Sequence, residues 1–347
     1  MKVLFRADGS AEQGTGHVMR CLTLAEAVRA RGHEALLMMA TTDVDWLASA
    51  VRDSGLPVHP CAADELPIED MLALEPDWTV VDSYRIPAAS VSDLAGSTAV
   101  LAIVDGETRG IDATLFLDQN LGAERRPPAS EQPQRFLAGS RYALVRDAIT
   151  RVRRSRPWLS TNRPPTVLCF MGGSDPTSAC TAVAMALSRS DADMAVTFVA
   201  PESQHGDLHA IAGGRSGWTV TAPTLRLPEL FAEADIVVSA AGTSAWDLCA
   251  LGIPSVLVAV VDNQQASLRE VVAGSLALGI DVVAGGPERF AQVRDAVESL
   301  LADETLRRDL SESARKAFDG DGAMRVAERM EFRNTPGERR EGPHADR

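Results

Sequence analysis

The chain has 347 residues, of which 45% are hydrophobic and 24% are charged, and its formal net charge is −14. This length and apolar content suffice for two domains with separate cores. The acidic balance disfavours general binding to nucleic acid or anionic membranes, and no apolar run has the length of a membrane span or the features of a signal peptide.

The chain opens with the order strand, loop, helix. Residues 2–8 form an apolar run typical of a buried strand, Gly14 and Gly16 lie in the loop, and a helix is expected to begin at His17. The glycines allow a tight turn and close approach to a ligand, and the free N–H groups of the helix start suit anionic oxygens. The positive helix end favours a neutral imidazole, which can accept a proton. We therefore expect His17 to be a general base, the alternative being a polar residue near a helix cap.

The rest of the first half alternates apolar runs with helical segments. Strands are expected at residues 34–39, 57–59, 78–83 and 99–105, and a helix at 44–51. This alternation predicts a parallel sheet covered on both faces. Asp8, Asp82 and Asp105 each end a strand, at the edge where ligands of such sheets collect. They could orient His17, bind sugar hydroxyls or hold a metal, or serve only as turn formers; we expect no metal because no second histidine is suitably placed.

The second half repeats the opening order. A strand at 166–171 is followed by the turn Gly172-Gly173-Ser174 and a helix from about Ser178, for which Ser174 or Asp175 is a suitable cap. Further strands are expected at residues 194–199, 218–220, 236–239 and 255–258. Two halves with the same order predict an α/β protein with two Rossmann-like domains that face a cleft.

Composition also suggests where the domains meet. Residues between 151 and 165 are rich in Arg, Ser and Pro, as expected of a linker. Helices are expected near the end of the chain, the last of them packing back on the first domain, and the final charged residues are expected to be disordered. The predicted parts are a first domain, a linker, a second domain, a C-terminal helix and a disordered tail, at residues 1–150, 151–165, 166–318, 319–332 and 333–347.

A nucleotide site is predicted in the second half. A strand ends near residue 240, and a helix is expected to start near Thr243, where small side chains leave the N–H groups open to a diphosphate. One turn later, Asp247 could accept hydrogen bonds from a ribose diol, and the amides that follow residue 262 can both donate and accept. Caps and helix packing explain each piece singly, but the set favours nucleotide binding. The residues assigned to this site are Gly172, Gly173, Ser174, Gly242, Thr243, Ser244, Asp247, Asn263 and Gln264.

The first half resembles a known family. Residues 5–22, with the motif Gly14-Thr15-Gly16-His17, are similar to the nucleotide-sugar hydrolases of the pseudaminic-acid pathway and the related spore-coat polysaccharide proteins, and so are the segments at 81–84, 104–106, 117–120 and 138–146. The resemblance implies that the histidine activates water for attack at the anomeric carbon, which releases UDP from an amino sugar. Gly106 and Asp118 depart from the family pattern where it would contact the sugar, so the sugar is left open. The residues assigned to the sugar side are Asp8, Gly14, Gly16, Asp82, Tyr84 and Asp105.

Residues 239–254 resemble the donor site of GT-B glycosyltransferases, such as the peptidoglycan enzyme that adds N-acetylglucosamine to lipid I. The hydrolase family shares this half, with glutamate where this chain has Asp247. The resemblance implies a GT-B fold and a reaction without metal or cofactor.

The leading hypothesis is a nucleotide-sugar hydrolase that inverts the anomeric carbon, with His17 as base and the helix starts at Gly172–Ser174 and Gly242–Ser244 stabilising the leaving diphosphate. The alternative is a GT-B glycosyltransferase with a small soluble acceptor, and a third class is a binding protein without catalysis.

The cysteines are odd in number and scattered, at positions 21, 61, 169, 180 and 249. This pattern indicates neither disulfides nor zinc and predicts a cytoplasmic protein. The oligomeric state is left open.

Overall fold

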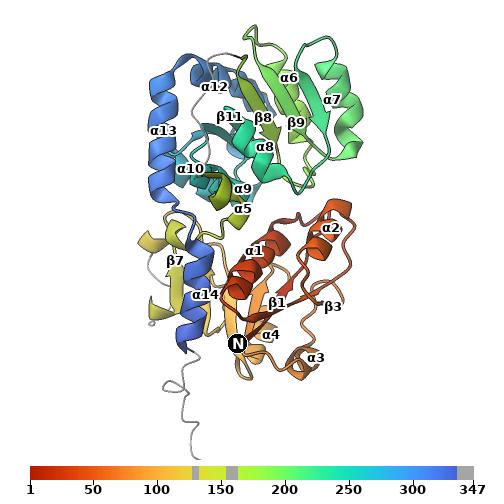
Figure 1. Cartoon of the computed structure of the whole chain (residues 1–347), viewed down its shortest axis with the longest axis vertical. Helices are drawn as coiled ribbons and strands as arrows, with labels where there is room; N and C mark the ends of the chain where they lie inside the picture. The colour runs from red at the N-terminus through yellow and green to blue at the C-terminus, as the bar shows by residue number, and fades with distance from the viewer. Residues whose placement is uncertain (127–132, 154–162, 334–347) are drawn as a thin grey trace, which may run out of the picture.

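The computed structural model describes residues 1–126, 133–153 and 163–333. Two α/β domains, each built on a parallel sheet, lie one after the other along the long axis of the molecule (Figure 1). Residues 154–162 of the predicted linker and 334–347 of the predicted tail lie outside the described residues. No helix in the described ranges combines the length and apolar character needed to cross a bilayer.

The first domain contains a seven-stranded sheet in the order β3-β2-β1-β4-β5-β6-β7. Its strands are β1 Lys2–Ala7, β2 Glu34–Met39, β3 Val58–Pro60, β4 Trp78–Asp82, β5 Ala99–Ile103, β6 Leu115–Asp118 and β7 Phe136–Ala138. The register aligns Ala7 of β1 with Asp82 of β4, so the carboxyl ends of these strands lie side by side. This is the edge at which doubly wound sheets bind ligands.

The second domain contains a six-stranded sheet in the equivalent order, β10-β9-β8-β11-β12-β13. Its strands are β8 Thr166–Phe170, β9 Ala195–Val199, β10 Trp218–Thr221, β11 Ile236–Ala240, β12 Ser255–Ala259 and β13 Leu278–Asp281. The expected α/β fold with two Rossmann-like domains is confirmed. The sequence did not predict β6, β7 and β13, because each has only three or four residues. Gly279 inside β13 further weakens the strand pattern.

Helices cover both faces of each sheet (Figure 1). The α-helices are α1 Gly16–Ala30, α2 Asp45–Asp53, α3 Ile68–Ala73, α4 Ala88–Ala95, α5 Asp147–Arg153, α6 Ala179–Leu187, α7 His205–Ala212, α8 Leu227–Glu233, α9 Ser244–Leu251, α10 Gln265–Ala273, α11 Val282–Gly285, α12 Ala291–Ala302, α13 Glu304–Ala317 and α14 Gly322–Arg333. Single-turn 3₁₀ helices are η1 Ala123–Arg125, η2 Pro133–Arg135, η3 Ser140–Tyr142, η4 Glu202–Gln204, η5 Asp262–Gln264 and η6 Pro287–Phe290.

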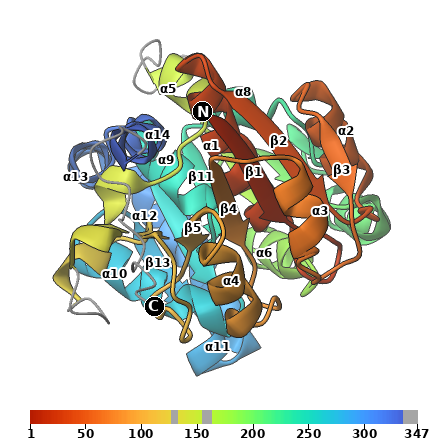
Figure 2. The same cartoon turned by 90° about the horizontal axis from the view of Figure 1, so that it is seen from below.

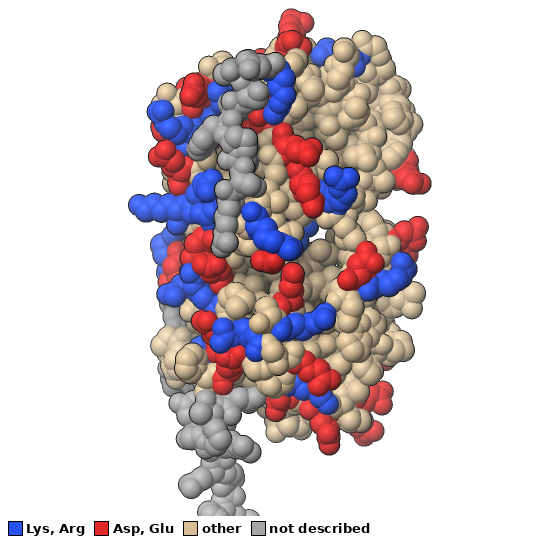
Figure 3. All heavy atoms as spheres, in the orientation of Figure 1, with Lys and Arg blue, Asp and Glu red and all other residues tan. Residues whose placement is uncertain are grey.

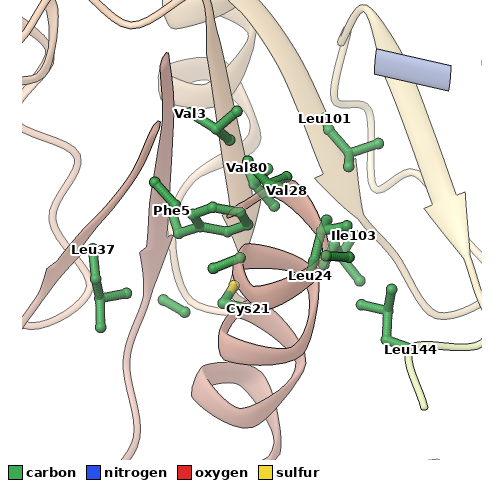
Figure 4. Packing of buried hydrophobic residues seen from close by; sticks show 14 of the residues in the cluster. Val3, Phe5, Cys21, Leu24, Val28, Leu37, Val80, Leu101, Ile103 and Leu144 are labelled. Carbon is green, nitrogen blue, oxygen red and sulfur yellow. The ribbon is translucent and has the colours of Figure 1, made fainter. Parts of the chain in front are cut away.

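The core beneath α1 fixes the position of the loop that precedes this helix. Phe5 of β1 packs with Cys21 and Leu24 of α1 and with Val80 of β4 (Figure 4). Alternate residues of β1 face the opposite side, where Leu4 belongs to a separate buried cluster. A strand buried on both faces is typical of a central parallel strand. The start of α1 is therefore held rigidly above the carboxyl end of the sheet.

The last helix returns to the first domain, as predicted. Figures 1 and 2 both show α14 beside α1, with which it makes extensive contacts. Val326 and Met330 of α14 are fully buried in the first-domain core, and Arg31 donates both to Glu328 and to Glu331. The first domain is thus completed by residues from the end of the chain.

The chain passes between the domains before the predicted linker. Ala143, Val145 and Ile149 already belong to a buried cluster of the second domain, and α5 packs against α8 and α9. The second passage, between α13 and α14, lies beside the first, because a Cβ atom added to Gly322 would come within 2.2 Å of the carbonyl oxygen of Ala143. The predicted boundary at residue 150 remains a prediction.

Candidate active site

A cavity of about 640 Å³ lies between the two domains, a size typical of small-ligand sites. The molecule is hollowed there, with acidic and basic side chains on both sides of the opening (Figure 3). Most of the residues assigned from the sequence line the cavity, namely Gly14, Gly16, His17, Tyr84, Asp105, Gly172, Gly173, Ser174, Gly242, Thr243, Ser244, Asp247, Asn263 and Gln264. Residues that are more than 200 positions apart in the sequence thus meet in one space.

His17 lies in the first turn of α1, as expected, and its side chain is only 13% exposed. Its Nδ1 is 2.7 Å from Oδ1 of the fully buried Asp82. Burial alone would raise the pKa of Asp82, but Arg20 and His17 outweigh burial and hold this pKa below its usual value. The ionised carboxylate can only accept, so Nδ1 donates to it, and in the neutral imidazole Nε2 then has the free lone pair. Nη2 of Arg20 lies 3.0 Å from the same Nδ1. Among the described residues, no protein group bonds Nε2, which makes it available to a ligand in the cavity.

Arg20 organises this part of the site and is a residue that the sequence analysis did not assign. It donates through Nε and Nη2 to Asp82, at 2.8 and 2.7 Å, and through Nη1 to both carboxylate oxygens of Asp105. Burial would raise the pKa of Asp105, but Arg20 and the hydrogen bonds from Tyr84 and Asn120 lower it to about 2. The position of Arg20, three residues after His17 on one helix face, was the available signal.

Tyr84 covers His17 edge to face, with the ring centroids 4.8 Å apart. Its hydroxyl donates to Asp105, and burial, followed by the nearby Asp105 charge, raises the pKa of this phenol above its usual value. The residue as a whole remains 46% exposed. Tyr84 and Asp105 also line an open groove of about 610 Å³ outside the cavity, together with Arg109 and Arg126.

Asp8 does not share this space. Its carboxylate is paired with the buried Arg6 and accepts from the backbone N–H groups of Ala40 and Asp64, and the residue does not line the cavity. Of the three acids expected together at the end of the sheet, Asp82 and Asp105 share the partner Arg20, and Asp8 does not. In the described parts of the chain, no three His, Cys, Asp or Glu side chains converge as a metal site.

On the second-domain side, the start of α9 faces the cavity. Thr243 occupies the N-cap position and Ser244 the first helical position, and no side chain caps this end. The N–H groups of Ala245 and Trp246 bond the carbonyl oxygens of Gly242 and Thr243. Among the described residues, the N–H groups of Thr243 and Ser244 are the ones that remain open to an anion. The two domains come close here, because a Cβ atom on Gly16 would lie 2.9 Å from Oγ1 of Thr243.

The start of α6 is not open in this way. The N-cap position is occupied by Ser178 and not by Ser174 or Asp175. The N–H groups of Ala179 and Cys180 nevertheless donate to the carboxylate of Asp175, at 3.0 and 2.9 Å. Burial raises the pKa of Asp175, although these hydrogen bonds oppose the shift. The positive end of α6 therefore already holds a carboxylate, and binding of a diphosphate by Gly172–Ser174 remains a prediction.

Asp247 lines the cavity, but its carboxylate is already bonded. Oδ2 accepts from Nε and Nη2 of Arg146, at 2.9 and 2.6 Å. Burial raises the pKa of Asp247, and Arg146 partly offsets this effect. Nearby, Gln264 accepts from the N–H group of Val260 through Oε1, so its amide nitrogen faces Gly242. Contact between Asp247 and a ribose remains a prediction.

The comparisons with known proteins add relatives of low identity. No protein-family model matches the chain. It is 21% identical over 335 residues to the spore coat polysaccharide biosynthesis protein SpsG of Bacillus subtilis, covering 94% of this chain and 96% of the relative. It is 23% identical over 268 residues to the uncharacterized protein MJ1062 of Methanocaldococcus jannaschii, which covers 74% of this chain. The chain spans about half (55%) of that relative's length.

Solved structures show the same architecture. Acinetobacter baumannii MurG matches with a TM-score of 0.66 and 15% identity, covering 96% of this chain and 100% of that one. S. aureus MnaA in complex with UDP matches with a TM-score of 0.67 and 14% identity, covering 96% of both chains. The spinosyn forosaminyltransferase SpnP matches with a TM-score of 0.66 and 15% identity, covering 96% and 98%. These likenesses establish the GT-B fold.

Proposed function

We propose that the protein is an enzyme that acts on a nucleotide-linked sugar and breaks the bond between the anomeric carbon and the diphosphate. The observation that carries the proposal is the His17–Asp82 pair at 2.7 Å, which faces the uncapped start of α9 across one cavity. A base on one side and an anion site on the other suit displacement at a carbon held between them.

The steps follow from this arrangement. The diphosphate lies against Thr243 and Ser244, whose helix start favours negative charge. Nε2 of His17 takes the proton of the nucleophile while the nucleophile's oxygen forms a bond to the anomeric carbon. The bond from that carbon to the diphosphate oxygen breaks, and the diphosphate leaves on the opposite side. The anomeric carbon is therefore inverted. Asp82 holds the Nδ1–H tautomer and stabilises the imidazolium that forms.

The nucleophile that we favour is a hydroxyl group of a small acceptor. One of the similar structures is a sugar transferase, and a second contains UDP, while none of the three just described is named as a hydrolase. The open groove beyond Tyr84 and Asp105 gives an acceptor room to reach His17. We therefore favour transfer of the sugar to an acceptor over the hydrolysis that the sequence first suggested.

Hydrolysis remains the second candidate because residues 5–22 and 81–84 resemble the hydrolase family. In that case water replaces the acceptor, and His17 has the same role. One experiment distinguishes the two reactions. UDP-, CMP- and GDP-linked amino sugars are incubated in oxygen-18 water, with and without a mixture of sugar acceptors, and the products are weighed.

Release of nucleotide only with an acceptor supports transfer, whereas free sugar labelled with oxygen-18 supports hydrolysis. Label on the nucleotide phosphate would show cleavage at phosphorus and contradict both. A His17→Asn variant that binds nucleotide should lose at least about 100-fold in turnover, the scale for losing a general base. Full activity of a folded His17→Asn variant would contradict the assigned base.

A further inference from the structure

A tryptophan of the first domain is bonded to the glycine turn of the second domain. Trp46 lies in α2 and packs against the first-domain core. Its indole Nε1 donates to the carbonyl oxygen of Gly173, at 3.1 Å. Both residues line the cavity. The ring is thus anchored in one domain while its polar edge reaches the other.

Space is the reason for glycine at position 173. The φ angle of Gly173 is outside the left-handed region, unlike that of Gly172 at +102°, so residue 173 has a backbone that other amino acids adopt. A Cβ atom at this position would lie only 2.2 Å from Cζ2 of Trp46 and 2.9 Å from Oγ1 of Thr15. Both obstructing atoms belong to the first domain. Glycine is therefore required at this position by the contact between the domains.

The contact is made by α2, which lies away from the two passages of the chain between the domains. The two passages of the chain between the domains lie side by side near Ala143 and Gly322. Figures 1 and 2 both show α2 on the side of the first domain away from α14. A rotation about the two passages therefore changes the distance between Trp46 and Gly173 more than the distances near Ala143.

We propose that Trp46 is a positioning residue that holds the two domains closed through Gly173 and fixes the Gly172–Gly173 turn against the first domain. This contact sets the distance between His17 and the start of α9. The closure itself is independent of the proposed function, whereas its effect on nucleotide binding rests on that function.

Two substitutions test the hydrogen bond and the space separately. Trp46→Phe keeps an aromatic ring but removes the N–H donor, and loss of one hydrogen bond should weaken nucleoside diphosphate binding about two- to tenfold. Gly173→Ala adds the Cβ atom and should weaken binding about five- to 100-fold, the range for overpacking. Trp218→Phe is the matched control, because Trp218 packs against Phe198 and Arg215 outside the cavity and should change binding less than twofold.

The decisive measurement is a double-mutant cycle between Trp46→Ala and Gly173→Ala. Affinities for UDP, CDP, GDP and dTDP are measured by calorimetry, and the radius of gyration of each protein is measured without nucleotide by small-angle X-ray scattering. Gly173→Ala should expand the protein and weaken binding when Trp46 is present. Removing the Trp46 ring relieves the clash but also removes the contact, so the double variant should match Trp46→Ala in affinity and compactness, and the two losses should not add. Circular dichroism melting confirms that each variant is folded.

Two outcomes would overturn the inference. In one, Trp46→Ala is as compact and binds nucleotide as tightly as the wild type, which would mean that Trp46 does not hold the domains closed. In the other, Gly173→Ala leaves both scattering and affinity unchanged, which would mean that the contact does not hold the domains closed. If none of the four nucleotides binds the wild-type protein, the proposed function fails, and the scattering comparison alone decides whether Trp46 closes the domains.

Discussion

Substituting Asp82 by asparagine tests the chemistry of His17 without removing the histidine. Oδ1 of Asp82 accepts from both His17 Nδ1 and Arg20 Nη2, and Oδ2 accepts from Arg20 Nε. Asparagine replaces one of these acceptors with an NH₂ group. If the NH₂ group takes the Oδ1 position, it faces two donors; at the Oδ2 position it faces the Nε–H of Arg20. Either orientation creates a contact between donors, and the carboxylate charge is lost in both.

The expected size of the effect follows from the hydrogen bond that is weakened. A hydrogen bond to a charged group contributes about 1.5–3 kcal/mol, which corresponds to about 10- to 150-fold in rate. Turnover of nucleotide sugar should fall by this factor in Asp82→Asn. Affinity for the nucleotide product should stay within about twofold, because Asp82 does not line the cavity.

Turnover is measured by mass analysis of the products, and nucleotide affinity by calorimetry. The matched control is Asp8→Asn, since Asp8 ends the neighbouring strand and pairs with Arg6 outside the cavity. It should change turnover less than threefold. Unchanged turnover in a folded Asp82→Asn protein, or equal losses in both variants, would refute the role given to Asp82.

Three further predictions follow from the same site. Arg146→Ala should lower the free energy of unfolding by about 3–5 kcal/mol, because buried Asp247 loses its partner; urea denaturation checks this, and Arg146→Met with Asp247→Leu should recover most of the loss. The pKa of Asp105, about 2 when folded against an ordinary 3.8, means that its stabilisation is present above about pH 4 and is lost as the pH falls toward 2. Acid unfolding of Asp105→Asn should therefore depend less steeply on pH than that of the wild type, and parallel curves would contradict this. Turnover should persist in excess EDTA, and a loss that added metal restores would show a metal requirement.

Local patterns allowed the sequence to predict much of the site. The strand, glycine loop and helix around His17 depend on residues close together in the chain, as does the start of α9 at Thr243. Parallel strands place their carboxyl ends together, so the proximity of Asp82 to His17 also followed from the pattern. Asp8 also follows the carboxyl end of a strand, but its side chain is paired with Arg6. The alternation of strands and helices gives no indication of this ion pair.

The parts that could not be predicted depend on long side chains or distant contacts. Arg146 and Asp247 are 101 positions apart, and their pairing requires the first chain passage to lie against α9. Trp46 bonds a residue 127 positions away, across the gap between domains. The strand β7 has three residues, too few for an alternating pattern to distinguish it from a loop.

The return of α14 to the first domain has a consequence for biosynthesis. Val326 and Met330 fill part of the core beneath α1, but the ribosome adds them only after the whole second domain. Domains generally fold in the order in which they are made. Here all residues of the second domain are synthesised before α14. Until α14 is made, the first domain is incomplete, and an apolar face of α1 is uncovered. The first domain can finish folding only when the last helix has left the ribosome.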